Sequence, residues 1–394
     1  MSQRNLIEPD TEFIKYIREN GGEDLKKCYQ CATCSSVCQL STEEYGFPRK
    51  QMLLAQWGLK DRLLADPGPW LCFYCGDCSK KCPRKGNPGE TLMAVRRYLT
   101  SQYDWTGLSR LMYKSVFGEV GILVFMAALI VLLFTAFHNF GYGLLYSSGT
   151  AGFSNVRLDL FAPIGVVDWG DRILAVLLGL LLLSNAARMF YHLTRGEKIP
   201  LRLYITQLPY MILHGITQKQ WGKCDGEGSV KNWLRHLMLV SGYAIMFTMV
   251  VVFLPWFQVK NSSLHWTSYL GYYATAVLIV STVWIVIDRI RKGTEMHRFS
   301  HFSDWLFPIM LFLAAVTGIL LNIFRVNNMP MPTYATYMIH MAVVVPMLMV
   351  EVPFGKWAHL LYRPLAIYIA AVKNKAHELQ ADEQVSADRL AASA

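Results

Sequence analysis

Hydrophobic and polar positions divide the 394-residue chain into three parts. Residues 1–110 are polar and charged, residues 111–363 contain long uncharged apolar runs, and residues 364–394 are polar again. A membrane-spanning helix needs about 20 predominantly apolar residues. Six runs are long enough to predict spans at 119–140, 171–193, 234–257, 267–288, 304–324 and 334–361. The pattern predicts a head (1–110), a transmembrane bundle (111–363) and a short tail (364–394), for which disorder is one option.

The polar head has a helical pattern of its own. Residues 49–65 and 89–103 carry apolar side chains at helical spacing, and the Pro67-Gly68-Pro69 segment ends the first of these stretches. No stretch alternates between apolar and polar residues as a strand does. The predicted fold class is therefore all-α, with a helical ferredoxin-like head and a bundle of about six transmembrane helices.

The net charge of +10 is concentrated in two loops between apolar runs, which fits membrane topology better than nucleic-acid binding. Cytoplasmic loops of membrane proteins are enriched in Lys and Arg. The two basic loops carry Arg195, Lys198, Arg202, Lys219, Lys223, Lys231 and Arg235, and Arg289, Arg291, Lys292 and Arg298. The first twenty residues contain no apolar stretch of a secretory signal. We therefore expect a multi-pass protein of the cytoplasmic (inner) membrane, with head and both termini in the cytoplasm.

Eight of the nine cysteines form two runs with one spacing, C-x2-C-x2-C-x3-C. The second run is followed by Pro83, as in bacterial ferredoxins, whereas Gln39 follows the first. Cytosolic thiols stay reduced, so clustered cysteines there indicate metal rather than disulfides. Structural zinc, the alternative, usually uses paired C-x2-4-C units. The spacing therefore predicts two [4Fe–4S] clusters.

In such runs three thiolates bind one cluster and the fourth reaches the other cluster. The predicted ligands of cluster 1 are Cys28, Cys31, Cys34 and Cys82. The predicted ligands of cluster 2 are Cys72, Cys75, Cys78 and Cys38. Over residues 20–105 the head resembles the ferredoxin-like C subunit of heterodisulfide reductases, and its two runs with a helical spacer are similar to the helical ferredoxin of succinate dehydrogenases.

Histidines inside apolar runs are costly in hydrocarbon and usually functional. His340 and His359 lie nineteen residues apart in the last predicted span, so one helix would carry a ligand near each face of the membrane. Pro346 and Pro353 are expected to bend this helix, which could open room for a macrocycle. His236 opens the third span at the level of His359. Facing histidines on packed helices can bind one haem iron from both sides. The alternative is that these histidines merely end helices at the interface.

The segment 337–364 resembles the last helix of the nitrate reductase gamma subunit and the cytochrome b (E) subunit of heterodisulfide reductases. That resemblance, which covers about 230–363, implies two haems b with His340 and His359 as ligands. We pair His236 with His359 on an inner haem. His340 would bind the outer haem and needs a second ligand at the same depth. His138 lies at a similar height and is one candidate, and Met246 is the other. Bis-histidine ligation is the commoner arrangement in such cytochromes, which favours His138.

Glu351 lies within the last span, and an unpaired carboxylate there is costly. Lys356, five residues later, is a candidate partner. We consider a proton path, a contact to a haem propionate and a simple helix-end pair for these two residues.

A head of the C-subunit type fused to a cytochrome b bundle of the E-subunit type most resembles the membrane subunits of quinone-interacting membrane-bound oxidoreductase complexes of sulfate reducers. The resemblance implies menaquinol as donor, cytoplasmic flavin and iron–sulfur subunits as partners, and electron delivery toward adenylylsulfate reductase. A heterodisulfide reductase-like or nitrate reductase gamma-like protein with another soluble partner is one alternative. A redox-sensing membrane protein or a transporter is the alternative of another class, although no broken-helix repeat supports it.

Overall fold

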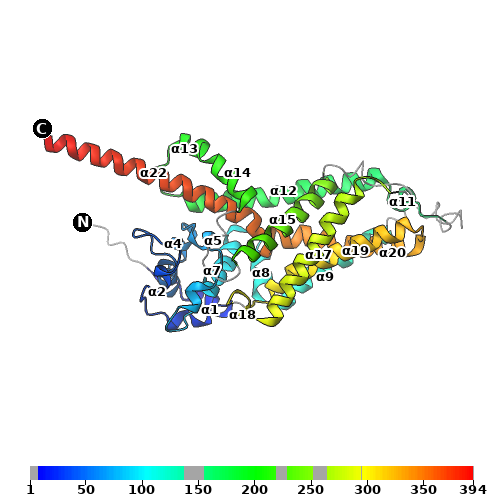
Figure 1. Ribbon diagram of the computed structural model, residues 1–394, viewed down its shortest axis with the longest axis horizontal. Coiled ribbons are helices and arrows are strands. Elements are labelled where there is room, and N and C mark those ends of the chain that lie inside the picture. Colours follow the sequence, from blue (N-terminus) through cyan, green and yellow to red (C-terminus); the bar gives the residue numbers. More distant parts are fainter. Residues whose placement is uncertain (1–7, 137–154, 219–228, 252–263, 294, 394) are drawn as a thin grey trace.

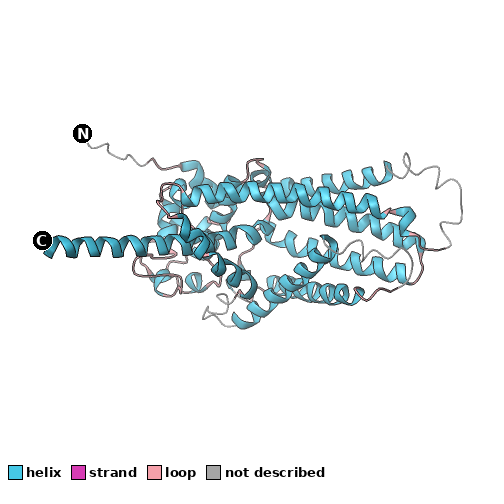
Figure 2. Cartoon of the chain, turned by 90° about the horizontal axis from the view of Figure 1, so that it is seen from above, coloured by secondary structure: helices cyan, strands magenta, loops and turns pink. Residues whose placement is uncertain are grey.

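The computed structural model describes residues 8–136, 155–218, 229–251, 264–293 and 295–393. Within these ranges the ordered elements are helices, and no strand occurs (Figure 2). In the described part of the chain, six helices are long and apolar enough to cross a membrane, which agrees with the predicted fold class and number of spans. They run side by side from the head toward the opposite end of an elongated molecule (Figure 1).

Short helices and loops build the head. Its elements are α1 (Thr11–Glu19), η1 (Glu23–Lys27), α2 (Thr33–Ser36), α3 (Arg49–Gln56), α4 (Lys60–Leu64), α5 (Gly68–Leu71), α6 (Asp77–Lys80) and α7 (Pro88–Tyr103). Helix α7 is the longest of these. It begins with Pro88, whose fixed φ suits the first helical position, and buries one stripe at Leu92, Val95, Leu99 and Tyr103.

The bundle follows α8 (Leu108–Lys114), which joins the head to the first long helix. The six candidate spans lie in α9 (Val116–Ala136), α12 (Ile164–Thr194), α15 (Ser229–Val251), α17 (Ser268–Arg291), α19 (Ser303–Val326) and α20 (Pro330–Pro346) with its continuation. Shorter helices are α11 (Leu158–Phe161), α13 (Leu201–Thr206), α14 (Leu208–Thr217) and α18 (Glu295–Arg298).

The last span, predicted at 334–361 as one helix bent at Pro346 and Pro353, is divided into several helical pieces. Helix α20 ends at Pro346 and is followed by a π-helical turn η5 (Met347–Glu351), α21 (Val352–Phe354), a 3-10 turn η6 (Lys356–Ala358) and α22 (His359–Ser393). Proline lacks the N–H that continues a helical ladder, which explains the change at Pro346. His340 and His359 therefore lie on different helices. The tail, for which disorder was an option, is helical to Ser393.

The head packs directly against the bundle. One buried core joins Phe13, Ile17 and Leu99 of the head to Met189 of α12 and Tyr362 of α22. In Figure 1, α22 leaves the bundle beside the head and extends beyond it. Because apolar burial favours association roughly in proportion to area, this shared core holds the cysteine loops against the end of the bundle.

Candidate redox sites

The two cysteine loops repeat the same backbone geometry. The second residue after each first cysteine has a positive φ, 59° at Gln30 and 56° at Tyr74. The fourth residue also has a positive φ, 66° at Ala32 and 89° at Gly76, and each precedes a one-turn helix. Left-handed residues turn the chain sharply. Each loop therefore wraps its first three cysteines around one side of a small space.

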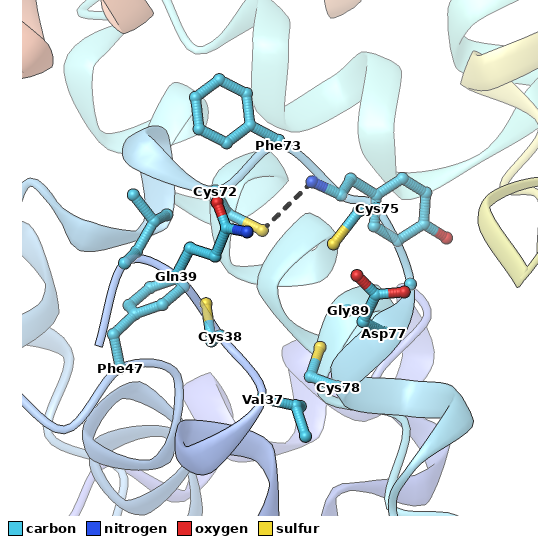
Figure 3. Close-up of a pocket in the computed structure, with 13 residues that line it drawn as sticks. Val37, Cys38, Gln39, Phe47, Cys72, Phe73, Cys75, Asp77, Cys78 and Gly89 are labelled. Carbon is cyan, nitrogen blue, oxygen red and sulfur yellow. Dashed lines mark hydrogen bonds between the residues drawn. The ribbon is translucent and has the colours of Figure 1, made fainter. Parts of the chain in front are cut away.

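The second loop surrounds a cavity of about 210 Å³. Cys38, Cys72, Cys75 and Cys78 line it, and their sulfur atoms face a common space, whereas Phe73 points away (Figure 3). The backbone N–H of Tyr74 donates a hydrogen bond to Cys72 Sγ over 3.3 Å. Cys38 comes from the first run, so the structure makes the grouping that cross-ligation requires. Ligation of iron by these four residues remains a prediction.

The first loop gathers the other four cysteines. Cys28, Cys31, Cys34 and Cys82 are electrostatic neighbours. The backbone N–H of Gly86 donates to Cys82 Sγ over 3.2 Å, and the Gln30 amide nitrogen donates to Cys28 Sγ over 3.5 Å. N–H donors of this kind stabilise charge on cluster sulfurs and ligating thiolates. This loop also fits the predicted cluster, with Cys82 supplied by the second run.

Burial and hydrogen bonds shift the cysteine pKa values in opposite directions. Desolvation raises the pKa of Cys34 to about 11 and that of Cys38 to about 12. Hydrogen bonds from Thr33 lower the pKa of the exposed Cys31. Within the described residues no three His, Cys, Asp or Glu side chains converge on one metal ion. In a cubane each thiolate binds a separate iron, so that site is wider than a single-ion site.

His236 on α15 and His359 at the start of α22 are brought near each other. His236 Nδ1 lies 2.5 Å from Gln218 Oε1, and His359 Nδ1 lies 2.6 Å from the Lys356 carbonyl oxygen. Both oxygens can only accept, so each Nδ1 donates and the lone pair is on Nε2. A neutral imidazole held in this way is a typical metal ligand. The pair therefore fits the predicted inner haem, and haem ligation by these two histidines stays a prediction.

His340, within α20, has the same local arrangement against α19. Its Nδ1 lies 2.8 Å from the Thr317 hydroxyl, which donates to the Leu313 carbonyl over 2.7 Å and so accepts from His340. A Cβ at Gly318 would lie 3.3 Å from His340 Cε1, so glycine leaves room for the ring. Met246, the competing ligand, packs in an apolar core cluster. His138 lies outside the described residues.

The Lys356 ammonium, the candidate partner of Glu351, bonds the Asp304 carboxylate instead, which also has Arg97 Nη2 at 3.6 Å and Arg289 Nη1 at 3.8 Å. The hydrogen-bond partners of Glu351 are the backbone N–H of Lys356 and the carboxyl group of Glu119. Among the described residues no Glu351–Lys356 ion pair occurs. The proton path and the propionate contact stay predictions.

Residues that the sequence pattern did not single out connect the cluster loops to the bundle. Arg363, one turn after His359, places its guanidinium carbon 4.2 Å from the centre of the Phe73 ring. Within the head, Arg96 of α7 fixes the backbone that leads into Cys72, because it donates to the carbonyl oxygens of Pro69, over 2.5 Å, and of Cys72. The sequence marks Arg363 only as a charge at the edge of an apolar run. It does not indicate that the Arg363 side chain contacts Phe73.

Residues 24–86 match the 4Fe-4S dicluster domain family. The chain is 34% identical over 128 residues to a protein of Archaeoglobus profundus that is described as like the C subunit of heterodisulfide reductase, covering 32% of this chain and 68% of that protein. The C subunit of the H(2):CoB-CoM heterodisulfide,ferredoxin reductase of Methanothermobacter thermautotrophicus is 38% identical over 76 residues, covering 19% of this chain and 41% of the relative. An iron-sulfur C subunit of the CoB--CoM heterodisulfide reductase of Methanocaldococcus jannaschii is 32% identical over 104 residues, covering 24% of this chain and 55% of the relative.

These matches and the paired cysteine loops define an iron–sulfur electron-transfer protein with a membrane-like helical region. The chain belongs to the family of proteins that are like the C subunit of heterodisulfide reductase. It spans about two thirds of the Archaeoglobus protein but only about two fifths of the Methanothermobacter protein. No solved structure matches this chain.

Proposed function

We propose that this chain is the membrane electron-transfer subunit of a quinone-linked oxidoreductase complex. In this proposal, menaquinol is the donor, and two haems b and the two clusters connect it to cytoplasmic flavin and iron–sulfur subunits. Bound haems and clusters carry single electrons, which is the only chemistry that they would supply here.

The contact between Arg363 and Phe73 is the observation that carries the proposal. Phe73 directly follows Cys72 in the second cluster loop, and Arg363 lies one helical turn beyond His359. Arg363 also acts electrostatically on both Cys72 and His236. A head that only sensed redox state would not need its cluster loop against the histidine pair of the bundle, whereas electron transfer needs this proximity.

The residues of the chain have distinct tasks in this mechanism. The two sets of cysteines hold the clusters, His236 and His359 hold the inner haem, and His340 with His138 holds the outer haem. Gln218, the Lys356 carbonyl and Thr317 orient the rings of His236, His359 and His340 respectively. Hydrogen bonds to the far nitrogen of a ligating histidine fix its tautomer and raise its basicity.

Haem sites at both faces serve a reaction in which electrons cross the hydrocarbon. We place the quinone site toward the outer face, near His340, and the head in the cytoplasm, on the basis of the basic loops. Moving one charge across a potential of about 100 mV corresponds to about 2.3 kcal/mol. A quinone site beside His236 and His359 is the competing position.

Basic side chains around the cluster loops suit docking of the partner subunits. This set is Lys26, Lys27, Lys80, Lys81, Arg84 and Lys85. Arg84 stacks on the exposed Tyr29 at 4.3 Å, which keeps an aromatic ring and a cation together at the surface. Charged contacts of this kind steer association and weaken as salt rises. The names of the relatives, which describe parts of reductases, support a multi-subunit complex.

The resemblance to membrane subunits of sulfate reducers makes adenylylsulfate reductase the proposed final acceptor. A heterodisulfide reductase-like complex with another soluble partner remains the second candidate, favoured by the match of the head to the heterodisulfide reductase relatives. Addition of purified adenylylsulfate reductase and its connecting subunits to the quinol-reduced protein decides between them: reoxidation of the haems supports the first, and no reoxidation supports the second.

A further inference from the structure

Two glutamates at the head end of the bundle are almost completely buried. Glu119 lies in the first turn of α9 and is 1% exposed. Glu351 ends the π-helical turn η5 and is 0% exposed. A Cβ at Gly355 would lie 2.3 Å from Glu351 Oε2, so the backbone of Gly355 packs directly against this carboxyl group.

The two carboxyl groups lie against each other. In the part of the chain that the structure describes, the hydrogen-bond partners of the two carboxyl groups are each other and, for Glu351, the backbone N–H of Lys356, and no other side chain donates to their oxygen atoms. The side-chain cations nearby are committed elsewhere: Lys356 and Arg97 both pair with Asp304. The pair therefore forms no ion pair with a described cation.

Two ionised carboxylates in contact and out of water are untenable, because each is desolvated and the like charges repel. Carboxyl pairs in this situation hold one proton between them. The charged and titratable groups facing this pair are Tyr113 on α8, Asp304 on α19, Arg97 on α7 and Lys356 in η6. Among these, Asp304 disfavours a second negative charge on the pair, whereas Arg97 and Lys356 favour the first negative charge.

Polar contacts connect this position to the second cluster loop. Arg97 lies 3.6 Å from Asp304 Oδ2 and 3.1 Å from Glu90 Oε1. The Tyr74 hydroxyl, between Cys72 and Cys75, donates to Glu90 Oε2 over 2.6 Å. A change of charge at this loop is therefore transmitted through a buried, low-dielectric network to the carboxyl pair.

We propose that Glu119 and Glu351 form a redox-linked proton site. At rest the two carboxyl groups share one proton. When an electron from a quinol or a chemical reductant enters the adjoining redox centres, the pair takes one proton from cytoplasmic water, so that the remaining carboxylate becomes a carboxylic acid. On reoxidation the electron leaves to the partner and the proton returns to water. The uptake and release of a proton with the electron rests on the proposed function, whereas the proton shared at rest does not.

Infrared spectroscopy of the full-length protein tests both steps. A protonated carboxyl group has a carbonyl band that shifts in D2O, and we expect this band in the resting protein at neutral pH. Glu119→Gln and Glu351→Gln should each remove it, Glu119→Asp and Glu351→Asp should shift it, and Glu12→Gln, at an exposed glutamate, should leave it unchanged. Reduction with dithionite should increase the band in the wild type and in Glu12→Gln, but not in the two glutamine variants of the pair.

Absence of the resting band, or its persistence in both glutamine variants, overturns the shared-proton site. A resting band that behaves as expected but does not change on reduction overturns the redox-linked step. Haem and iron contents of the same samples separate this proposal from the proposed function. A sample without haem that still shows the resting band contradicts the cytochrome and leaves the carboxyl pair standing.

Discussion

Arg363 stacks on Phe73 at 4.2 Å and thereby joins the turn after His359 to the loop that contains Cys72. The positive charge lies close to the second set of cysteines. Reduction adds negative charge to a cluster, and a nearby cation stabilises that charge. Arg363→Gln should therefore lower the reduction potential of the cluster held by Cys38, Cys72, Cys75 and Cys78, by on the order of tens of millivolts.

A potentiometric titration followed by electron paramagnetic resonance measures this shift. Arg18→Gln removes an exposed cation of α1 and serves as the matched control. Arg363→Lys should restore part of the potential but not the stacking on Phe73. Equal potentials in wild type and Arg363→Gln would show that this contact is only structural.

Cys38→Ala should destroy the cluster whose other ligands lie more than thirty residues later in the chain. We expect cluster iron to fall from about eight to about four atoms, because one cubane loses its fourth ligand and the other does not. Iron analysis and resonance spectra of anaerobic protein provide the measurement. If the signal of the cluster bound by Cys28, Cys31 and Cys34 is lost instead, Cys38 belongs to that cluster and the cross-ligation is wrong.

Removal of the clusters by a chelator should leave thiols of very different reactivity. Only the thiolate reacts with iodoacetamide, and its fraction at a given pH falls as the pKa rises. Thr33 lowers the pKa of the exposed Cys31, whereas burial raises the pKa of Cys38 to about 12. At pH 8, mass spectrometry should find Cys31 labelled first and Cys38 much later. Labelling of Cys38 at the rate of Cys31 contradicts these environments.

Variants of the histidines should remove the haems one at a time. His236→Ala and His359→Ala should each lose about half of the haem, and His340→Ala and His138→Ala should lose the other half, since one axial ligand of four is removed in each case. Pyridine haemochrome analysis and reduced spectra distinguish the two halves. His377→Ala, at an exposed histidine of α22, is the control. If His138→Ala keeps both haems, a residue other than His138 is the second ligand of the outer haem.

Thr317 should matter through His340 alone. Thr317→Val removes the acceptor of the His340 Nδ1–H and should lower the affinity for the outer haem about 10- to 100-fold. Thr317→Ser should restore it, and Thr248→Val, at an exposed threonine bonded only to a helix carbonyl, should have no effect. Haem titration of the apoprotein measures this, and an unchanged affinity in Thr317→Val would exclude the positioning role.

The sequence predicted the helical fold and six helices long enough to cross a membrane, because apolar runs encode them directly. It also predicted two cysteine sets, whose ligation of clusters stays a prediction. The prolines predicted a bend of the last span, and helix α20 ends at Pro346. The π-helical turn and the break at Gly355 were not predicted, since the apolar pattern continues through 334–361. Glu119 was overlooked because it stands at the edge of its span. Its contact with Glu351 depends on how α9 packs against η5, and spacing along one helix carries no information about packing between helices.

Anaerobic reduction by menadiol, a soluble menaquinol analogue, tests the central claim most directly. Oxidised full-length protein is mixed with menadiol while the visible spectrum is recorded. We predict that sharp bands of reduced haem b appear and that the broad absorbance of the clusters then bleaches. A protein that shows cluster absorbance but no haem b bands, even after dithionite, would contradict the proposed electron path.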